Sequence, residues 1–190
     1  MKLSLSRRDL LAFAALTAAS RALGAAPAAG AAEASLAGGA PPGAPPPRGV
    51  APGAMRTLEA ACARILPSDD GPGAREANVI RFIERQLDGP LRRLRPAMEQ
   101  GALLLDRWSR KRFGDRPFAQ LDAAQQDDVL GQLSRAEIPV KSFPQAELFR
   151  ALHALTLEGF LSDPAHGGND REAGWRAIGF AAPGLRHAHH

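Results

Sequence analysis

The sequence lacks the residues that build disulfides, haem attachment sites and nucleotide loops. Cys62 is the only cysteine among 190 residues, so no disulfide can form within the chain. A Cys-x-x-Cys-His motif is absent, which excludes covalently attached haem. No glycine-rich run follows a strand-like segment, so we predict no dinucleotide or phosphate loop. Tyrosine is absent altogether. We therefore predict no catalytic residue, cofactor site or metal site in this chain.

Long apolar runs are also missing. The candidate closest to a membrane span, Leu10–Leu23, is rich in alanine and interrupted by Arg21, whereas a spanning helix needs about 20 predominantly apolar residues. A basic start, a short apolar run and small residues beyond it are typical of a secretory signal peptide. Paired arginines at its head indicate the twin-arginine route, which exports folded proteins. The residues that we expect to carry this signal are Ser6, Arg7, Arg8, Leu10 and Leu11.

Composition divides the chain into four parts. We predict a signal peptide over residues 1–24, whose cleavage site the small residues leave open. Residues 25–54 are almost wholly Ala, Gly and Pro, which predicts a semi-extended, disordered linker because no apolar periodicity can bury a core there. Residues 55–184 are long enough for a single domain. Residues 185–190 hold three histidines and are predicted to form a flexible tail.

The excess of positive charge belongs mainly to the signal. The chain has 24 Lys and Arg against 20 Asp and Glu, and residues 1–24 carry four of the bases and one acid. The exported part is therefore left with a net charge of +1. A local excess of arginine remains between Arg85 and Arg116. We interpret it as a solvated helix face that could still meet an acidic partner surface, and we predict no nucleic-acid binding because no aromatic residues alternate with the bases.

Apolar spacing in the domain is helical throughout. Thr57 can cap a first helix that runs to Ile65, and a second helix spans Ala77 to Leu87. A third follows from Leu91 to Arg112, in which Pro96 predicts a kink or a fresh start after Arg95. The pair Asp122 and Gln125 forms a capping box that begins a fourth helix, ending at Arg135. A fifth has a broad apolar face made by Leu148, Phe149, Leu152, Leu155, Thr156, Gly159 and Phe160.

These lengths predict an all-α fold, a small orthogonal bundle of about five helices followed by a C-terminal loop and a short helix. Cys62 lies on the apolar stripe of the first helix. It is either a buried thiol or, since the chain is expected to leave the cytoplasm, the site of an intermolecular disulfide.

The segment after the fifth helix has the most specific composition. We expect Asp163-Pro164 to end that helix and Gly167-Gly168-Asn169 to supply positive-φ positions for a tight loop. After this loop Trp175 and Ile178 are again apolar, and they are three residues apart, as in one helical turn. Gly159 leaves room for another backbone to approach. Oxygen and nitrogen ligands of Asp163, His166, Asn169 and Asp170 would allow a metal site, but their spacing is not that of an EF-hand or a zinc loop.

This segment resembles the gluconate 2-dehydrogenase subunit 3 family. The resemblance is carried by Gly159-Phe160, Asp163-Pro164, Gly167-Gly168-Asn169, Gly174-Trp175 and Ile178-Gly179-Phe180. The run from Leu58 to Asp70 and the run from Ala77 to Leu87 are similar to the opening of that family, so the likeness extends over most of Leu58–Gly184.

The resemblance implies an accessory subunit of a periplasmic complex that oxidises a sugar, sugar acid or polyol. A large subunit would hold FAD and catalyse, a multihaem cytochrome c with haem c would take the electrons, and the twin-arginine translocase would export the small and large subunits together. The complex would be peripherally associated with the membrane. The partner-binding residues that we expect are Gly159, Phe160, Asp163, Pro164, His166, Gly167, Gly168, Asn169, Gly174 and Trp175.

Two alternatives to the accessory role remain. The chain could be a stand-alone exported binding module whose Gly-Gly-Asn loop recruits a different partner. It could also be an enzyme that uses Glu158, Asp163 and His166 as acid–base residues, although one histidine with nearby carboxylates gives no arrangement typical of a nucleophile or a cofactor site.

Overall fold

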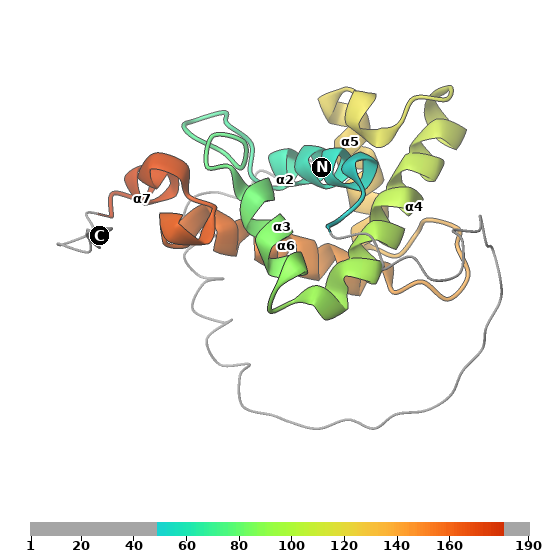
Figure 1. The fold of residues 1–190 in the computed structure, drawn as a ribbon. Helices are drawn as coiled ribbons and strands as arrows, with labels where there is room; N and C mark the ends of the chain where they lie inside the picture. Colours follow the sequence, from blue (N-terminus) through green and yellow to red (C-terminus); the bar gives the residue numbers. More distant parts are fainter. Residues whose placement is uncertain (1–48, 181–190) are drawn as a thin grey trace. The chain divides into compact units, whose positions relative to one another are not determined.

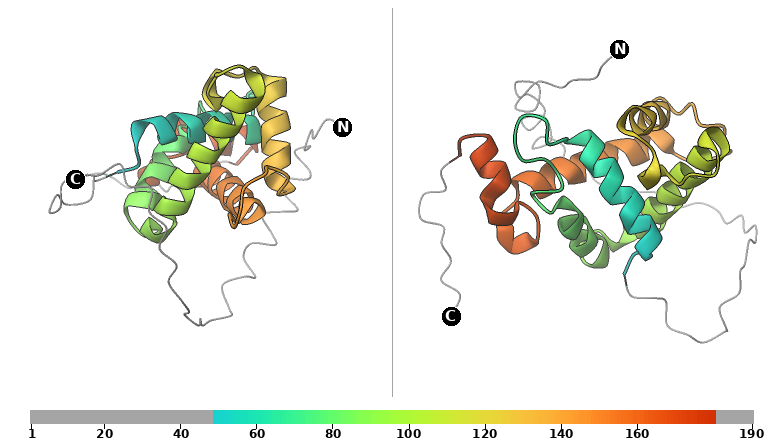
Figure 2. Two further views of the ribbon diagram at one scale, coloured as in Figure 1. Left: turned by 90° about the vertical axis from the view of Figure 1, so that its right-hand side faces the viewer. Right: turned by 90° about the horizontal axis from the view of Figure 1, so that it is seen from above.

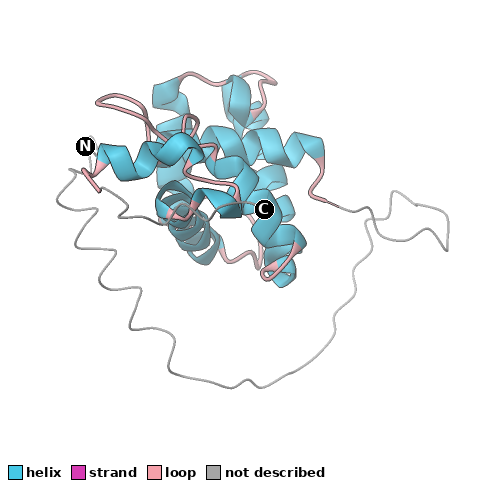
Figure 3. Cartoon of the chain, turned by 60° about the vertical axis from the view of Figure 1, so that its left-hand side comes forward, coloured by secondary structure: helices cyan, strands magenta, loops and turns pink. Residues whose placement is uncertain are grey.

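The computed structural model describes residues 49–180, and in this range the chain contains α-helices, 3-10 turns and loops but no β-strand (Figures 1 and 3). The all-α prediction is therefore confirmed. The predicted signal peptide, most of the predicted linker and the histidine tail lie outside the described residues. The elements are α2 (Pro52–Ile65), α3 (Val79–Asp88), η1 (Arg92–Leu94), α4 (Arg95–Phe113), η2 (Phe118–Gln120), α5 (Ala123–Ser134), α6 (Gln145–Leu161), η3 (Pro164–His166), η4 (Asp170–Glu172) and α7 (Ala173–Ala177).

The first helix begins earlier than its sequence pattern predicts. Helix α2 starts at Pro52, whose fixed φ suits the first turn, so the predicted cap at Thr57 is wrong. Thr57 is buried inside the helix, and its hydroxyl donates a hydrogen bond to Asp106 Oδ1 on α4 at 3.0 Å. The same carboxylate oxygen accepts the backbone N–H of Phe118 at 3.0 Å. One aspartate thus ties together α2, α4 and η2.

Local signals place the other helix boundaries well. Pro96 lies in the first turn of α4, so this helix starts afresh after the 3-10 turn η1 instead of kinking. The capping box of α5 is present: Asp122 Oδ1 accepts the N–H of Gln125 at 2.9 Å, and the Gln125 side chain accepts the N–H of Asp122 at 3.4 Å. The fifth predicted helix is α6, with Leu148, Leu152 and Leu155 buried.

Helices α2 and α6 form the centre of the bundle. Each of them contacts α3, α4 and α5 as well as the other, and α6 alone carries α7 at its C-terminal end (Figures 1 and 2). Side chains from all five long helices meet in one core, which includes Leu58, Ile83, Leu105, Leu133 and Leu152. This core fixes the position of the α6 C-terminus, from which the C-terminal segment extends.

Candidate functional site

The C-terminal segment, Gly159–Phe180, folds back against the end of α6 and against α3. Gly159 allows the contact with α3, because a Cβ at this position would lie 2.9 Å from Phe82 Cδ1 and 3.1 Å from Val79 Cγ1 on that helix. A Cβ on Gly168 would collide with the carbonyl oxygen of Gly159, so the two glycine backbones are in direct contact. The expectation that another backbone approaches Gly159 is therefore confirmed.

The loop that follows α6 is shaped by two different glycine requirements. Gly167 has φ +99°, and a Cβ there would lie 2.9 Å from Cδ of Arg85, whose guanidinium donates to the carbonyl of Ala165 at 2.9 Å. Gly168 does not have a positive φ, so that prediction is wrong for this residue. It must be glycine because the Gly159 carbonyl occupies the space of a side chain. The third predicted left-handed residue, Asn169, has φ +49°.

Asn169 holds the segment together from inside. Its side chain is fully buried, and its amide nitrogen donates to the carbonyl of Ser162 at 2.8 Å. Its amide oxygen accepts the backbone N–H of Gly174 at 2.7 Å. Gly174 in turn leaves no room for a side chain, because a Cβ would collide with the carbonyl oxygen of Phe160. One asparagine therefore joins the end of α6 to the start of α7.

Trp175 fastens the short helix α7 from the other side. The indole N–H donates to the carbonyl of Leu161 at 2.9 Å, and the ring is half-buried. The ring meets that of Phe180 in a T-shaped contact, with ring centroids 5.5 Å apart. Phe180 and Ile178 remain 48% and 45% exposed. The segment thus presents three neighbouring apolar side chains of one short stretch, Trp175, Ile178 and Phe180, which we call the C-terminal apolar patch.

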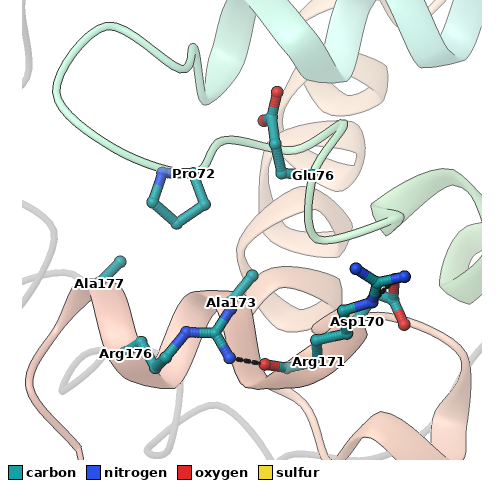
Figure 4. Close-up of a pocket in the computed structure, with 7 residues that line it drawn as sticks. All are labelled: Pro72, Glu76, Asp170, Arg171, Ala173, Arg176 and Ala177. Atoms are coloured by element: carbon teal, nitrogen blue, oxygen red, sulfur yellow. Dashed lines mark hydrogen bonds and ion pairs between the residues drawn. The ribbon is translucent and has the colours of Figure 1, made fainter.

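An open depression of about 660 Å³ lies between the loop that precedes α3 and the η4–α7 region (Figure 4). Four charged residues and three small apolar residues line it, namely Glu76, Asp170, Arg171 and Arg176 together with Pro72, Ala173 and Ala177. The backbone N–H of Asp170 donates to the carbonyl of Ala77 at 3.1 Å and so joins the two sides. Hydrogen bonds from the Ser68 hydroxyl and the Gly73 N–H lower the pKa of Glu76.

Arg171, which lines this depression, and the next residue, Glu172, both adopt left-handed backbone conformations, with φ +50° and +58°. Non-glycine residues rarely do so, and each such residue costs on the order of 1–3 kcal/mol. The Arg176 guanidinium donates to the Arg171 carbonyl (Figure 4). The surrounding contacts therefore hold this turn in a strained shape.

The structure brings the expected partner-binding residues together in the C-terminal segment but places many of them inside it. Gly159, Phe160, Gly168, Asn169 and Gly174 are buried, and their role is to shape the segment. The exposed member is His166, and the partly exposed members are Asp163, Pro164, Gly167 and Trp175. Asp163 caps η3 by accepting the N–H of Ala165 at 2.9 Å. Whether these residues bind a partner stays a prediction. The export residues lie outside the described range.

Sequence reasoning missed Ile178 and Phe180 as site residues. Their apolar character was visible in the sequence, but their exposure was not, because it depends on where every other helix of residues 49–180 lies. The four polar residues considered for a metal do not converge. In residues 49–180 no group of three or more His, Cys, Asp or Glu side chains is placed to hold a metal ion, and the Asn169 amide is already bonded at both of its ends.

Cys62 is 1% exposed and faces α6, so of the two alternatives the structure has the buried thiol. Thr156 Oγ1 lies 3.3 Å from its sulfur. Burial raises the pKa of the thiol to about 12, which leaves it protonated in the folded protein.

A membrane-spanning helix is not found among residues 49–180, where every helix is too short or too polar to cross a bilayer.

Comparison with known proteins identifies the family. Residues 52–184 match the model of the family described as gluconate 2-dehydrogenase subunit 3. No curated protein and no solved structure matches this chain. The matched range includes every helix described above, the Gly-Gly-Asn loop and the C-terminal apolar patch. The match covers well over half of the chain's length, and the chain therefore belongs to the gluconate 2-dehydrogenase subunit 3 family.

Proposed function

We propose that this chain is the non-catalytic accessory subunit of a periplasmic FAD-dependent dehydrogenase complex. It binds the folded flavoprotein subunit through the C-terminal apolar patch, carries it through twin-arginine export and stabilises it. The substrate of the complex is a sugar, a sugar acid or a polyol. FAD belongs to the large subunit, and haem c belongs to a multihaem cytochrome subunit that accepts the electrons.

Family membership supports the accessory role. The family is described as one subunit of a multi-subunit dehydrogenase, and this description implies a larger catalytic partner for its members. A twin-arginine signal adds support, because this route exports folded proteins and a flavoprotein must fold around its cofactor before export. The small subunit then carries the export signal for both proteins, and the large subunit catalyses the reaction.

The observation that carries the choice of surface is the exposure of Ile178 and Phe180 on a segment that is otherwise firmly held. Asn169 and Trp175 fix the backbone through three hydrogen bonds to buried or half-buried groups. The apolar patch is therefore presented in one conformation, which reduces the ordering entropy that binding would cost. Aromatic residues are enriched at the centres of protein interfaces, and the Trp175–Phe180 pair has that character.

The test is co-purification of the flavin-bearing subunit with variants of this chain. Ile178→Ser removes an exposed apolar side chain from the patch, and Val140→Ser is its matched control, since Val140 is also β-branched, is 41% exposed and lies outside the C-terminal segment. Burial of a half-exposed isoleucine stabilises a complex by about 1 kcal/mol, and an interface hot spot contributes ~2 kcal/mol or more. We expect Ile178→Ser to weaken binding roughly fivefold to thirtyfold and Val140→Ser to leave it unchanged.

Melting temperatures of both variants should stay close to that of the wild type, because neither side chain is in the core. Equal retention of the flavoprotein by Ile178→Ser, Phe180→Ser and the control would refute the patch as the binding surface.

A further inference from the structure

A second surface lies on α4, at the end of the bundle away from α7 (Figures 1 and 2). Residues on the outer face of this helix follow one another at spacings of three and four, so they form a single stripe on the order of 20 Å long. All of them are exposed. The stripe consists of Pro96, Gln100, Leu103, Arg107, Arg110 and Lys111.

The carboxylates of α4 do not neutralise this stripe. The helix contains two acidic residues, Glu99 and Asp106. Asp106 is directed inward to Thr57 and to the N–H of Phe118, and Glu99 accepts the N–H of Ala51 at 3.3 Å. Tertiary hydrogen bonds therefore draw the negative charges of the helix to its inner side and flank, and leave the positive charges outside.

Ion pairs compensate only part of the positive charge. Arg110 pairs with Asp115 at 3.1 Å, and Arg112 pairs with Asp128 at 2.9 Å. Arg107 and Lys111 make no ion pair within residues 49–180, nor do Arg92 and Arg93 in the adjoining turn η1. Lys111 rests over the ring of Trp108, with Nζ 5.5 Å from its centroid, which holds the ammonium group on the surface.

Leu103 lies in the middle of the stripe and is 50% exposed. An exposed apolar side chain flanked by Gln100 on one side and by cations on the other has the layout of a protein interface, in which a desolvated core is surrounded by a polar rim. A membrane surface fits less well, because interfacial helices insert an apolar face, and the apolar face of α4 (Met98, Ala102, Leu105) is buried in the core. A nucleic acid fits less well because no exposed aromatic ring lies on the stripe for base stacking.

We propose that the α4 stripe docks a carboxylate-rich surface of a second protein, separate from the partner of the C-terminal apolar patch. Guanidinium groups bind carboxylates bidentately, and Arg107 is the residue placed beside Leu103 to do so. With one docking surface at each end of the bundle, the subunit can join two proteins. Electrostatic docking of this kind speeds association and depends on salt.

The test uses the full chain and a fluorescein-labelled oligoglutamate peptide, with binding followed by anisotropy at low ionic strength. The stripe variant is Arg107→Glu with Lys111→Glu. Its control is Arg81→Glu with Lys141→Glu, which reverses the same number of exposed cations outside the stripe and gives the same net charge. The cations of residues 1–48 are common to all three proteins. Vesicles of phosphatidylglycerol and phosphatidylcholine form a parallel arm, and circular dichroism confirms that each variant is folded.

We expect the stripe variant to lose about tenfold or more in affinity for the peptide and the control to lose clearly less. The binding of the wild-type chain should weaken steeply as salt rises. Equal losses in both variants would overturn the proposal, because net charge alone would then explain binding. Stripe-dependent binding to the vesicles without binding to the peptide would also overturn it, in favour of a lipid surface. The flavoprotein is absent from this assay, so its outcome is independent of the function proposed above.

Discussion

Replacement of Asn169 by Asp tests whether the C-terminal segment depends on one buried amide. The change keeps the shape of the side chain and the oxygen that accepts the N–H of Gly174. It replaces the amide nitrogen that donates to the Ser162 carbonyl at 2.8 Å. An ionised carboxylate would place a second oxygen against that carbonyl, in a site with no exposed area. The position itself, with φ +49°, tolerates Asp about as well as Asn.

The magnitude follows from these two contacts. A buried carbonyl that loses its donor costs about 1–3 kcal/mol, and burial of the carboxylate adds to it. We expect the free energy of unfolding at pH 7.5 to fall by about 2–4 kcal/mol, measured as the shift of the urea midpoint at constant m-value.

The same variant should show a pH dependence of known sign. Burial and the facing carbonyl favour the protonated carboxyl, whose O–H can donate to Ser162, so the pKa of the new aspartate is raised in the folded state. Its stability relative to the wild type is therefore greatest below about pH 4, near the unfolded pKa, and is lost as pH rises through the raised folded pKa. The difference in the free energy of unfolding between the variant and the wild type should therefore shrink on acidification, by up to about 1.4 kcal/mol per pH unit.

Asn78→Asp is the matched control. Asn78 is also left-handed, with φ +50°, but it is half-buried and its side chain does not cap α3. An aspartate there lies at a helix N-terminus, which favours a negative charge, so stability should change little. If Asn169→Asp lowers the free energy of unfolding by less than about 1 kcal/mol, and this loss does not vary with pH, then the amide is not what holds the segment.

Two further predictions concern the thiol and export. Cys62, with a pKa of about 12, should resist thiol reagents at pH 8 in the folded protein and react at once in denaturant. Rapid labelling of the native chain would instead show that α2 and α6 separate often enough to expose the thiol. Because that pKa is raised on folding, stability should also fall as pH rises above about 9. Replacement of Arg7 and Arg8 by Lys keeps the charge but removes the guanidinium groups, so both this chain and the flavoprotein activity should decrease in the periplasm. Normal periplasmic flavoprotein activity in that double variant would refute the carrier role.

The sequence was sufficient for the features that act within one or two helical turns. The capping box at Asp122 and Gln125 placed the start of α5, and of the two alternatives that Pro96 offered, a kink or a fresh start, the structure has the fresh start. The repeat of leucines gave the inner face of α6. Each of these signals is local: a cap or a proline acts on backbone groups within one helical turn, and an apolar stripe is recognised from side chains three or four residues apart.

Tertiary packing decided the features that join distant parts of the chain. Thr57 suggested a cap, but its hydroxyl bonds to Asp106, 49 residues later. Gly168 suggested a positive φ, but what it requires is space against the carbonyl of Gly159. The exposure of Ile178 and the positive charge that ion pairs leave on the α4 stripe likewise depend on where other helices end and where their carboxylates point. The sequence by itself determined the family, the helices and their order. Only the tertiary structure decided which side chains were left on the surface, because the burial of a side chain and the compensation of its charge are set by all of its spatial neighbours and not by the residues adjacent in the chain.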